Sequence, residues 1–239
     1  MNLTHPSPNF GDRRGKRVDL VVLHYTAMPT CAAALERLCD PEAEVSAHYL
    51  IDEDGTLFSL VDEGARAWHA GAGNWRGEGD VNSRSIGVEL ANPGDRPFPE
   101  PQMRALERLL AGILHRHGLP PEAVIAHSDM APERKGDPGP RFDWRRLGLQ
   151  GLSVWPVSPA DAPPPQPSPT GGEGGDSPEA GGFIADLRAF GYPEAAPETL
   201  LTAFRLRFRP WAVGPLDAAD LLLAAGLRAI AVDASRSDA

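Results

Sequence analysis

Two cysteines, a deficit of basic residues and the lack of any long apolar run limit what this 239-residue chain can be. A transmembrane helix needs about 20 consecutive apolar residues, and no segment provides them. The first residues also lack the apolar core of a secretory signal peptide. With 33 acidic against 23 basic residues, the chain is short of the positive surface that nucleic acids or anionic membranes require. We therefore expect no membrane span, no signal peptide and no nucleic-acid partner.

The two cysteines, Cys31 and Cys39, lie about 12 Å apart if the segment between them is helical, because each helical residue advances about 1.5 Å. A disulfide joins Cα atoms that are less than about 7 Å apart, so these two cysteines are not expected to pair. The same distance argues against zinc coordination by the pair. Free thiols are typical of proteins from a reducing compartment.

Proline and glycine, 25 of each, are concentrated between residues 158 and 180, where no aliphatic side chain is larger than alanine. Such a segment cannot bury enough apolar area to offset the entropy lost on ordering, so it is expected to be a linker. The resulting division is a first domain at 1–157, the linker at 158–180, a separate small domain at 181–230 and a tail at 231–239.

The first domain is expected to be α/β, with a mixed central β-sheet flanked by helices. Apolar runs and alternating apolar residues predict strands at 18–25, 85–92 and 124–126, and a hairpin from 46–51 and 56–62. Helical spacing of apolar residues predicts helices at 31–39 and 101–117. The small domain has the same spacing at 183–190, 198–208 and 217–227, which predicts a three-helix bundle around an aromatic core.

Polar side chains interrupt this apolar framework at a proline-rich loop that contains His127, Lys135 and Asp137. Prolines fix φ, so the loop loses little conformational freedom when these side chains converge on a ligand. One more ligand would complete a zinc site with an open fourth position. His24 is the candidate because it ends the first apolar strand, at the sheet edge where α/β proteins bind ligands. A histidine that ends a strand is more often structural, and only the proline-rich loop changes that interpretation.

A carboxylate, Glu89, lies within the predicted strand at 85–92, on the face that it shares with two small residues. Burial raises the pKa of an unpaired carboxylate, which suits a general base working near neutral pH. An ion pair with a nearby arginine such as Arg84 explains the same residue equally well.

Five motifs occur together and in a fixed order. They are Val22–Tyr25, Ser46–Ile51, Arg66–Gly71, Ser85–Leu90 and His127–Trp144. With these motifs the chain resembles the zinc-dependent N-acetylmuramoyl-L-alanine amidases of bacterial cell-wall recycling, a group related to phage T7 lysozyme and the peptidoglycan recognition proteins. The resemblance extends over most of residues 1–155. More loosely, the small domain resembles the peptidoglycan-binding domains of wall hydrolases.

By this resemblance His24, His127 and Asp137 match the zinc ligands, Glu89 the catalytic glutamate and Lys135 the lysine before the last ligand. Zinc held by two imidazoles and a carboxylate lowers the pKa of bound water toward about 7 and polarises a carbonyl. Glu89 would move the proton from this water to the departing nitrogen, and Lys135 would stabilise the negative charge on the tetrahedral oxygen. The resemblance implies cleavage between N-acetylmuramic acid, in its 1,6-anhydro form, and the L-alanine of the stem peptide.

Tyr25, Arg66, Trp68, His69 and Arg134 are the expected substrate contacts. An indole packs on sugar faces, and a guanidinium binds a carboxylate through two hydrogen bonds. The alternatives are a core position for Trp68, a packing or supporting role for His69 and solvated surface positions for the two arginines.

Two other functions stay open at this point. One is a non-catalytic peptidoglycan receptor, and the other is an amidase for a different N-acyl substrate. The residue pattern favours the muropeptide amidase because ligands, base and lysine are all present. Cytoplasmic action on recycled fragments is the expected location. The wall-binding resemblance of the small domain favours the periplasm or the cell wall instead.

Overall fold

The computed structural model describes residues 2–156 and 178–237. Residues 158–177 of the expected linker therefore lie outside the described part. Within that part, no helix combines the length and the apolar character needed to cross a membrane.

A six-stranded mixed sheet forms the centre of the first domain, in the order β1-β5-β4-β7-β3-β8. The strands in that order are Asn2–Thr4, Leu57–Ser59, Tyr49–Ile51, Ser85–Leu90, Leu20–Tyr25 and Val124–Ala126. All neighbours are parallel except β4 and β5, which form the predicted antiparallel hairpin. A second sheet pairs β2 (Phe10–Gly11) with β6 (Arg66–Ala67). The predicted mixed α/β class is confirmed.

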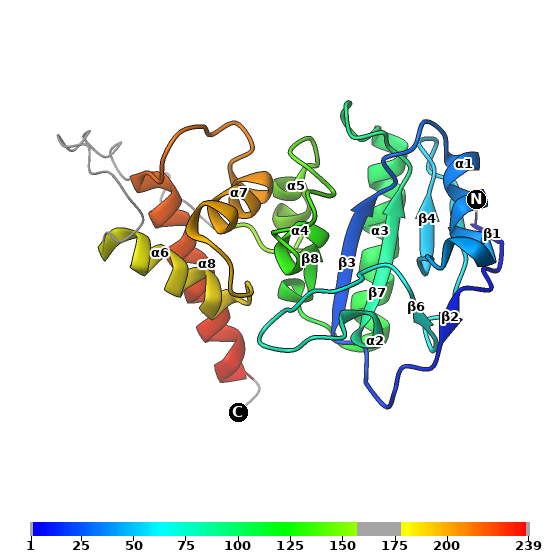
Figure 1. Cartoon of the computed structure of the whole chain (residues 1–239), viewed down its shortest axis with the longest axis horizontal. Coiled ribbons are helices and arrows are strands. Elements are labelled where there is room, and N and C mark those ends of the chain that lie inside the picture. Colours follow the sequence, from blue (N-terminus) through cyan, green and yellow to red (C-terminus); the bar gives the residue numbers. More distant parts are fainter. Residues whose placement is uncertain (1, 157–177, 238–239) are drawn as a thin grey trace.

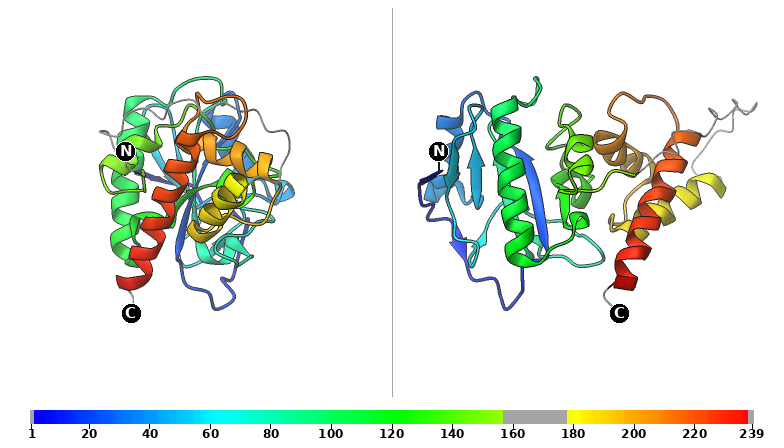
Figure 2. Two further views of the ribbon diagram at one scale, coloured as in Figure 1. Left: turned by 90° about the vertical axis from the view of Figure 1, so that its left-hand side faces the viewer. Right: turned by 180° about the vertical axis from the view of Figure 1, so that it is seen from behind.

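Side-chain alternation along β3 separates an apolar face from a functional one. Val21 and Leu23 pack with residues of β7 and β8 against α3 (Glu100–His117), which covers one face of the sheet (Figure 2). His24 belongs to the opposite face, together with Glu89 of β7. The predicted division of these strands into two faces therefore positions the polar side chains away from α3.

The opposite face is covered by different elements at its two ends. At the β4 end it meets α1 (Cys31–Cys39), whose first turn is capped by Thr30 Oγ1 accepting from Ala33 N at 3.2 Å. Both cysteines are free. Toward the β8 end it meets α4 (His127–Met130), whose Met130 belongs to the same apolar cluster as Val22 and Ile125. The short helix α2 (Val81–Arg84) leads into β7, whereas α5 (Trp144–Leu149) packs with α3 on the other face.

Three helices form the C-terminal bundle, as expected: α6 (Pro178–Phe190), α7 (Pro197–Phe208) and α8 (Ala218–Ser237). Its boundaries differ from the expected ones. α6 begins inside the segment assigned to the linker, and α8 continues through most of the segment assigned to the tail at 231–239. A composition-based boundary marks where apolar residues become frequent, and a helix can extend beyond that point.

The bundle is not a separate module, contrary to the expectation, because it shares an apolar core with the first domain (Figure 1). From the first domain this core includes Leu20, Val22, Trp75, Ile125 and Met130, and from the bundle Phe183, Leu187, Phe190, Phe204 and Phe208. All ten side chains are at most 2% exposed. The sequence could not reveal this docking, since the same aromatic spacing serves an isolated bundle equally well.

Candidate active site

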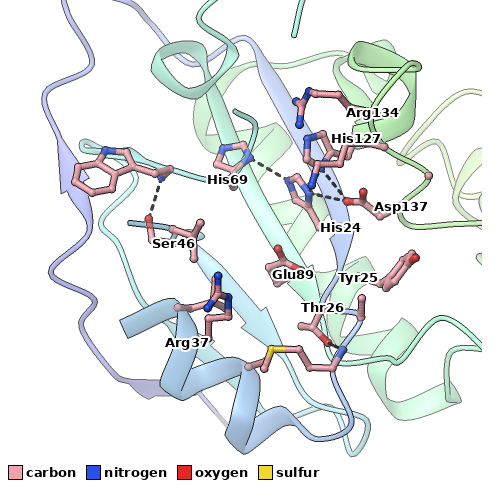
Figure 3. Close-up of a pocket in the computed structure, with 18 residues that line it drawn as sticks. His24, Tyr25, Thr26, Arg37, Ser46, His69, Glu89, His127, Arg134 and Asp137 are labelled. Carbon is pink, nitrogen blue, oxygen red and sulfur yellow. Dashed lines mark hydrogen bonds and ion pairs between the residues drawn. The ribbon is translucent and has the colours of Figure 1, made fainter. Parts of the chain in front are cut away.

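Three neighbouring strands deliver polar side chains to one edge of the sheet (Figure 3). His24 is the penultimate residue of β3 and pairs in register with Glu89 of the parallel strand β7. His127 follows β8, on the other side of β3, as the first residue of α4. Parallel strands end at the same edge, so residues far apart in sequence come together here.

His24, His127 and Asp137 point one atom each at a common centre. His24 Nδ1 lies 2.9 Å from both His127 Nδ1 and Asp137 Oδ2, and the latter two atoms are 3.0 Å apart. These are the three residues expected as metal ligands. Their potential ligand atoms all lie within 4.8 Å of one another.

A chain of hydrogen bonds behind His24 indicates its tautomer. Ser85 Oγ donates to the Val81 carbonyl at 2.6 Å, so it accepts from His69 Nε2 at 3.1 Å. His69 Nδ1 is then free to accept from His24 Nε2, at 3.0 Å. We therefore assign the proton of His24 to Nε2, which leaves the Nδ1 lone pair directed at the common centre.

His127 has the same tautomer for a simpler reason. Its Nε2 donates to the Ala70 carbonyl at 2.9 Å, so Nδ1 of the neutral ring carries a lone pair. With Asp137 ionised, three acceptor atoms face one another without a proton between them. A cation resolves this repulsion, and two imidazoles with one carboxylate form a donor set typical of catalytic zinc. Hydrogen bonds to the outer ring nitrogens are also typical of zinc sites.

The electrostatics keep this cluster in the protonation state that a metal requires. Burial, followed by the neighbouring His127, lowers the pKa of His24 to about 4, so its ring is neutral at pH 7. Burial alone would raise the pKa of Asp137, but the two adjacent imidazoles hold it below the usual range. Metal ligands must be deprotonated, and the pKa shifts of His24 and Asp137 both favour that state.

Glu89 lies beside the cluster with an unsatisfied oxygen. Its Oε2 is buried and has no hydrogen-bond partner among the described residues. Burial and then the charge of Asp137 raise the pKa of Glu89 to about 8, an effect that the positive charge of Lys135 partly opposes. The ion pair with Arg84 does not form, because Arg84 binds Asp19 at 2.6 Å instead. A carboxyl group with a pKa near neutrality is suited to proton transfer.

These groups line a cleft of about 380 Å³. Of the substrate contacts expected from the sequence, four lie in its wall: Tyr25, Trp68, His69 and Arg134. His69 also supports His24, and both of its ring nitrogens are used in hydrogen bonds. Arg134 donates to the Ala70 carbonyl at 2.9 Å. The same carbonyl accepts from His127 Nε2, so Arg134 also stabilises the loop that holds this histidine.

Arg66 does not line the cleft, unlike the other four expected substrate contacts. Its side chain donates to Ser83 Oγ at 3.0 Å and to Asp80 Oδ1 at 3.1 Å, on the small two-stranded sheet. An arginine next to a recognised motif looks like a substrate contact in sequence. Its direction depends on Asp80, fourteen residues away, and only the fold brings that partner to it.

Arg37 is a cleft residue that the sequence did not single out. It projects from α1 toward the cleft, and Glu89 lies between it and Asp137 (Figure 3). No ion pair or hydrogen bond of its guanidinium occurs within residues 2–156 and 178–237. Lys135 also lines the cleft, as expected of a residue that stabilises negative charge there.

Gly87 leaves the space that His69 occupies. A Cβ atom at this position would lie 2.3 Å from His69 Cγ. We therefore expect Gly87→Ala to displace the imidazole and to lower the free energy of unfolding by about 1–3 kcal/mol, the usual cost of overpacking a core. Urea denaturation measures this change. Gly181→Ala is the control, because its Cβ would meet no atom within 4 Å. Equal stability of the two variants would contradict the role of Gly87.

Comparison with known proteins agrees with this geometry. Residues 14–140 match the family model described as N-acetylmuramoyl-L-alanine amidase. The amidase AmiD of Escherichia coli is 34% identical over 222 residues, which cover 81% of this chain and 76% of that protein. The 1,6-anhydro-N-acetylmuramyl-L-alanine amidase AmpD of Haemophilus influenzae is 31% identical over 159 residues, covering 59% of this chain and 86% of that protein.

Solved structures extend the similarity to the bundle. Escherichia coli AmiD, in complex with anhydro-N-acetylmuramic acid-L-Ala-D-γ-Glu-L-Lys, superposes with a TM-score of 0.75 at 32% identity and covers 93% of this chain and 91% of its own. AmpDh3 of Pseudomonas aeruginosa has the same TM-score at 29% identity, with 95% of each chain covered. The chain therefore belongs to the N-acetylmuramoyl-L-alanine amidase family.

Proposed function

We propose that this amidase cleaves the bond between N-acetylmuramic acid, in its 1,6-anhydro form, and the L-alanine of the stem peptide, in a zinc-dependent reaction that recycles or remodels the cell wall. The observation that carries the proposal is the convergence of three metal-ligand atoms beside the unpartnered Glu89. The anhydromuramyl peptide bound to the Escherichia coli relative supports the choice of substrate.

Each group of the site has one role in this proposal. Zinc bound by His24, His127 and Asp137 would supply a Lewis acid for the scissile carbonyl and for water. Glu89 accepts a proton at its unpartnered Oε2 and then passes it to the departing nitrogen. Lys135 faces the same cleft, and its positive charge stabilises the oxygen that becomes negative in the transition state.

Mass spectrometry of the products tests the reaction. Purified 1,6-anhydro muropeptide and its non-anhydro counterpart are incubated with the zinc-loaded protein. We expect a free stem peptide that begins with L-alanine, together with the free anhydro sugar, and faster turnover of the anhydro compound. Tight binding with unchanged substrate masses would overturn the proposal and favour a receptor.

His127→Ala is expected to abolish stoichiometric zinc binding, because two of the three donors cannot hold the ion as firmly. Elemental analysis after dialysis against a weak chelator measures the metal content. His115→Ala is the matched control, since His115 is an exposed histidine on α3, away from the cleft. An undiminished zinc content in His127→Ala would remove this residue from the site.

Arg37→Ala is expected to raise KM by about 10-fold with little change in kcat. Arg37 has no partner within the described part of the chain, and a carboxylate of the stem peptide would supply one through charge-assisted hydrogen bonds. Loss of such a contact weakens the binding of the substrate and of the transition state equally, so KM rises and kcat stays the same. Steady-state kinetics with Arg104→Ala, an exposed arginine of α3, as the control measures the effect. If both variants have the wild-type KM, Arg37 has no part in binding.

A further inference from the structure

Helix α7 lies next to the short helix α4 (Figure 1). From α7, the side chain of Arg207 extends into the first domain. Its Nη1 donates to Asp129 Oδ2. Its Nη2 donates to the Val124 carbonyl at 3.1 Å and to Ser153 Oγ at 3.0 Å. A single guanidinium therefore binds both the strand β8 and the helix α4. The candidate ligand His127 lies at the junction of these two elements, as the first residue of α4.

Asp129 is the centre of these contacts and lies two residues after His127. Its Oδ2 accepts from Ala126 N at 2.9 Å, which fixes the turn from β8 into α4. Its Oδ1 accepts from the Tyr192 hydroxyl at 2.6 Å, a second contact from the bundle. The turn also connects to the third candidate ligand, because Ser128 N donates to the Asp137 carbonyl at 3.1 Å.

The ion pair of Arg207 and Asp129 is fully enclosed. Both side chains are 0% exposed, and the guanidinium lies 4.3 Å from the ring centre of Trp144. Burying such a pair removes the water around both charges, which costs free energy. Apolar residues of similar volume in its place therefore commonly give a protein equal or greater stability. Its directional hydrogen bonds do what apolar contacts cannot, since they determine where the backbone around Ala126 and His127 lies.

We propose that the C-terminal bundle is a positioning element of the metal site. Arg207 and Tyr192 hold Asp129, and Asp129 holds the turn that directs His127 Nδ1 at its two partners. This inference rests on the proposed function, in which His127 is a zinc ligand. It assigns the bundle a part in building the catalytic site, besides any contact that it makes with peptidoglycan.

Zinc affinity of the full-length protein, measured by competition with a chromophoric chelator, tests the positioning role. We expect Arg207→Gln to weaken zinc binding by about 10- to 100-fold, as loss of a group that orients a ligand does. Excess zinc should restore most of the turnover. The matched control is Arg205→Gln. Arg205 is also a buried arginine of α7, paired with Asp220 at 2.5 Å, but its hydrogen bonds and ion pairs within the described part of the chain stay inside the bundle.

The outcomes separate this inference from the proposed function. A wild-type protein that binds no zinc would overturn both. Wild-type zinc affinity in a folded Arg207→Gln, or an equal loss in Arg205→Gln, would overturn the positioning role alone. If Arg207→Gln does not fold, Tyr192→Phe replaces it, because this change removes only the hydroxyl that bonds Asp129. A severalfold weaker zinc affinity is then expected, and an unchanged affinity would contradict the proposal.

Discussion

Replacing Glu89 with glutamine is expected to lower kcat by about two to four orders of magnitude and to leave zinc content unchanged. Glutamine has the same shape but cannot accept the proton that hydrolysis releases. Glu89 is not among the three converging ligand atoms, so the metal site keeps its donors. Single-turnover kinetics on anhydro muropeptide and elemental analysis measure the two quantities.

The folded protein should tolerate this substitution well. Burial raises the pKa of Glu89 to about 8, which means that the carboxylate is disfavoured at its site. A neutral amide avoids that cost, so the free energy of unfolding should stay the same or increase slightly. Glu36→Gln, on the exposed side of α1, is the control for a general effect of charge removal. A turnover of Glu89→Gln within tenfold of the wild type would assign the proton transfer to another group.

Much of the site could be predicted from the sequence because strand periodicity fixes which residues share a face. His24 and Glu89 alternate with apolar neighbours on two buried strands, so the sequence predicts on which face of its strand each one lies. The observed register, with His24 opposite Glu89, supplies the detail that periodicity leaves open. The catalytic and metal-binding roles stay predictions that variants of the residues concerned will test. These residues are His24, Glu89, His127, Lys135 and Asp137.

The direction of long polar side chains could not be predicted in the same way. Arg66 is drawn to Asp80 and Ser83, whereas Arg37 reaches the cleft from a helix without a recognised motif. His69 has its two ring nitrogens bonded to His24 and Ser85, so it supports a candidate ligand while it lines the cleft. In each case the deciding partner lies in another element of the fold.

The docked bundle is the largest departure from the sequence-based expectation, because a separate domain could be removed without damage to the first domain, whereas a docked one shares its core. Without the bundle, Trp75, which is 0% exposed in the full chain, would lose its contacts with the rings of Phe190 and Tyr192. Asp129 would lose Arg207 and Tyr192 together. Breaking a buried ion pair from one side costs about 3–5 kcal/mol, a large part of the roughly 5–15 kcal/mol that stabilises a typical domain.

Deleting residues 178–239 is therefore expected to abolish cooperative unfolding, expose apolar surface and remove tight zinc binding. Thermal unfolding by circular dichroism, binding of an apolar dye and chelator competition measure these three effects. A full-length chain with a protease site inserted between residues 158 and 177, cut after folding, is the control. It should keep its activity, because the shared core holds the two pieces together without the covalent connection. A truncated protein that unfolds cooperatively at the wild-type temperature and binds zinc normally would show that the first domain does not depend on this core.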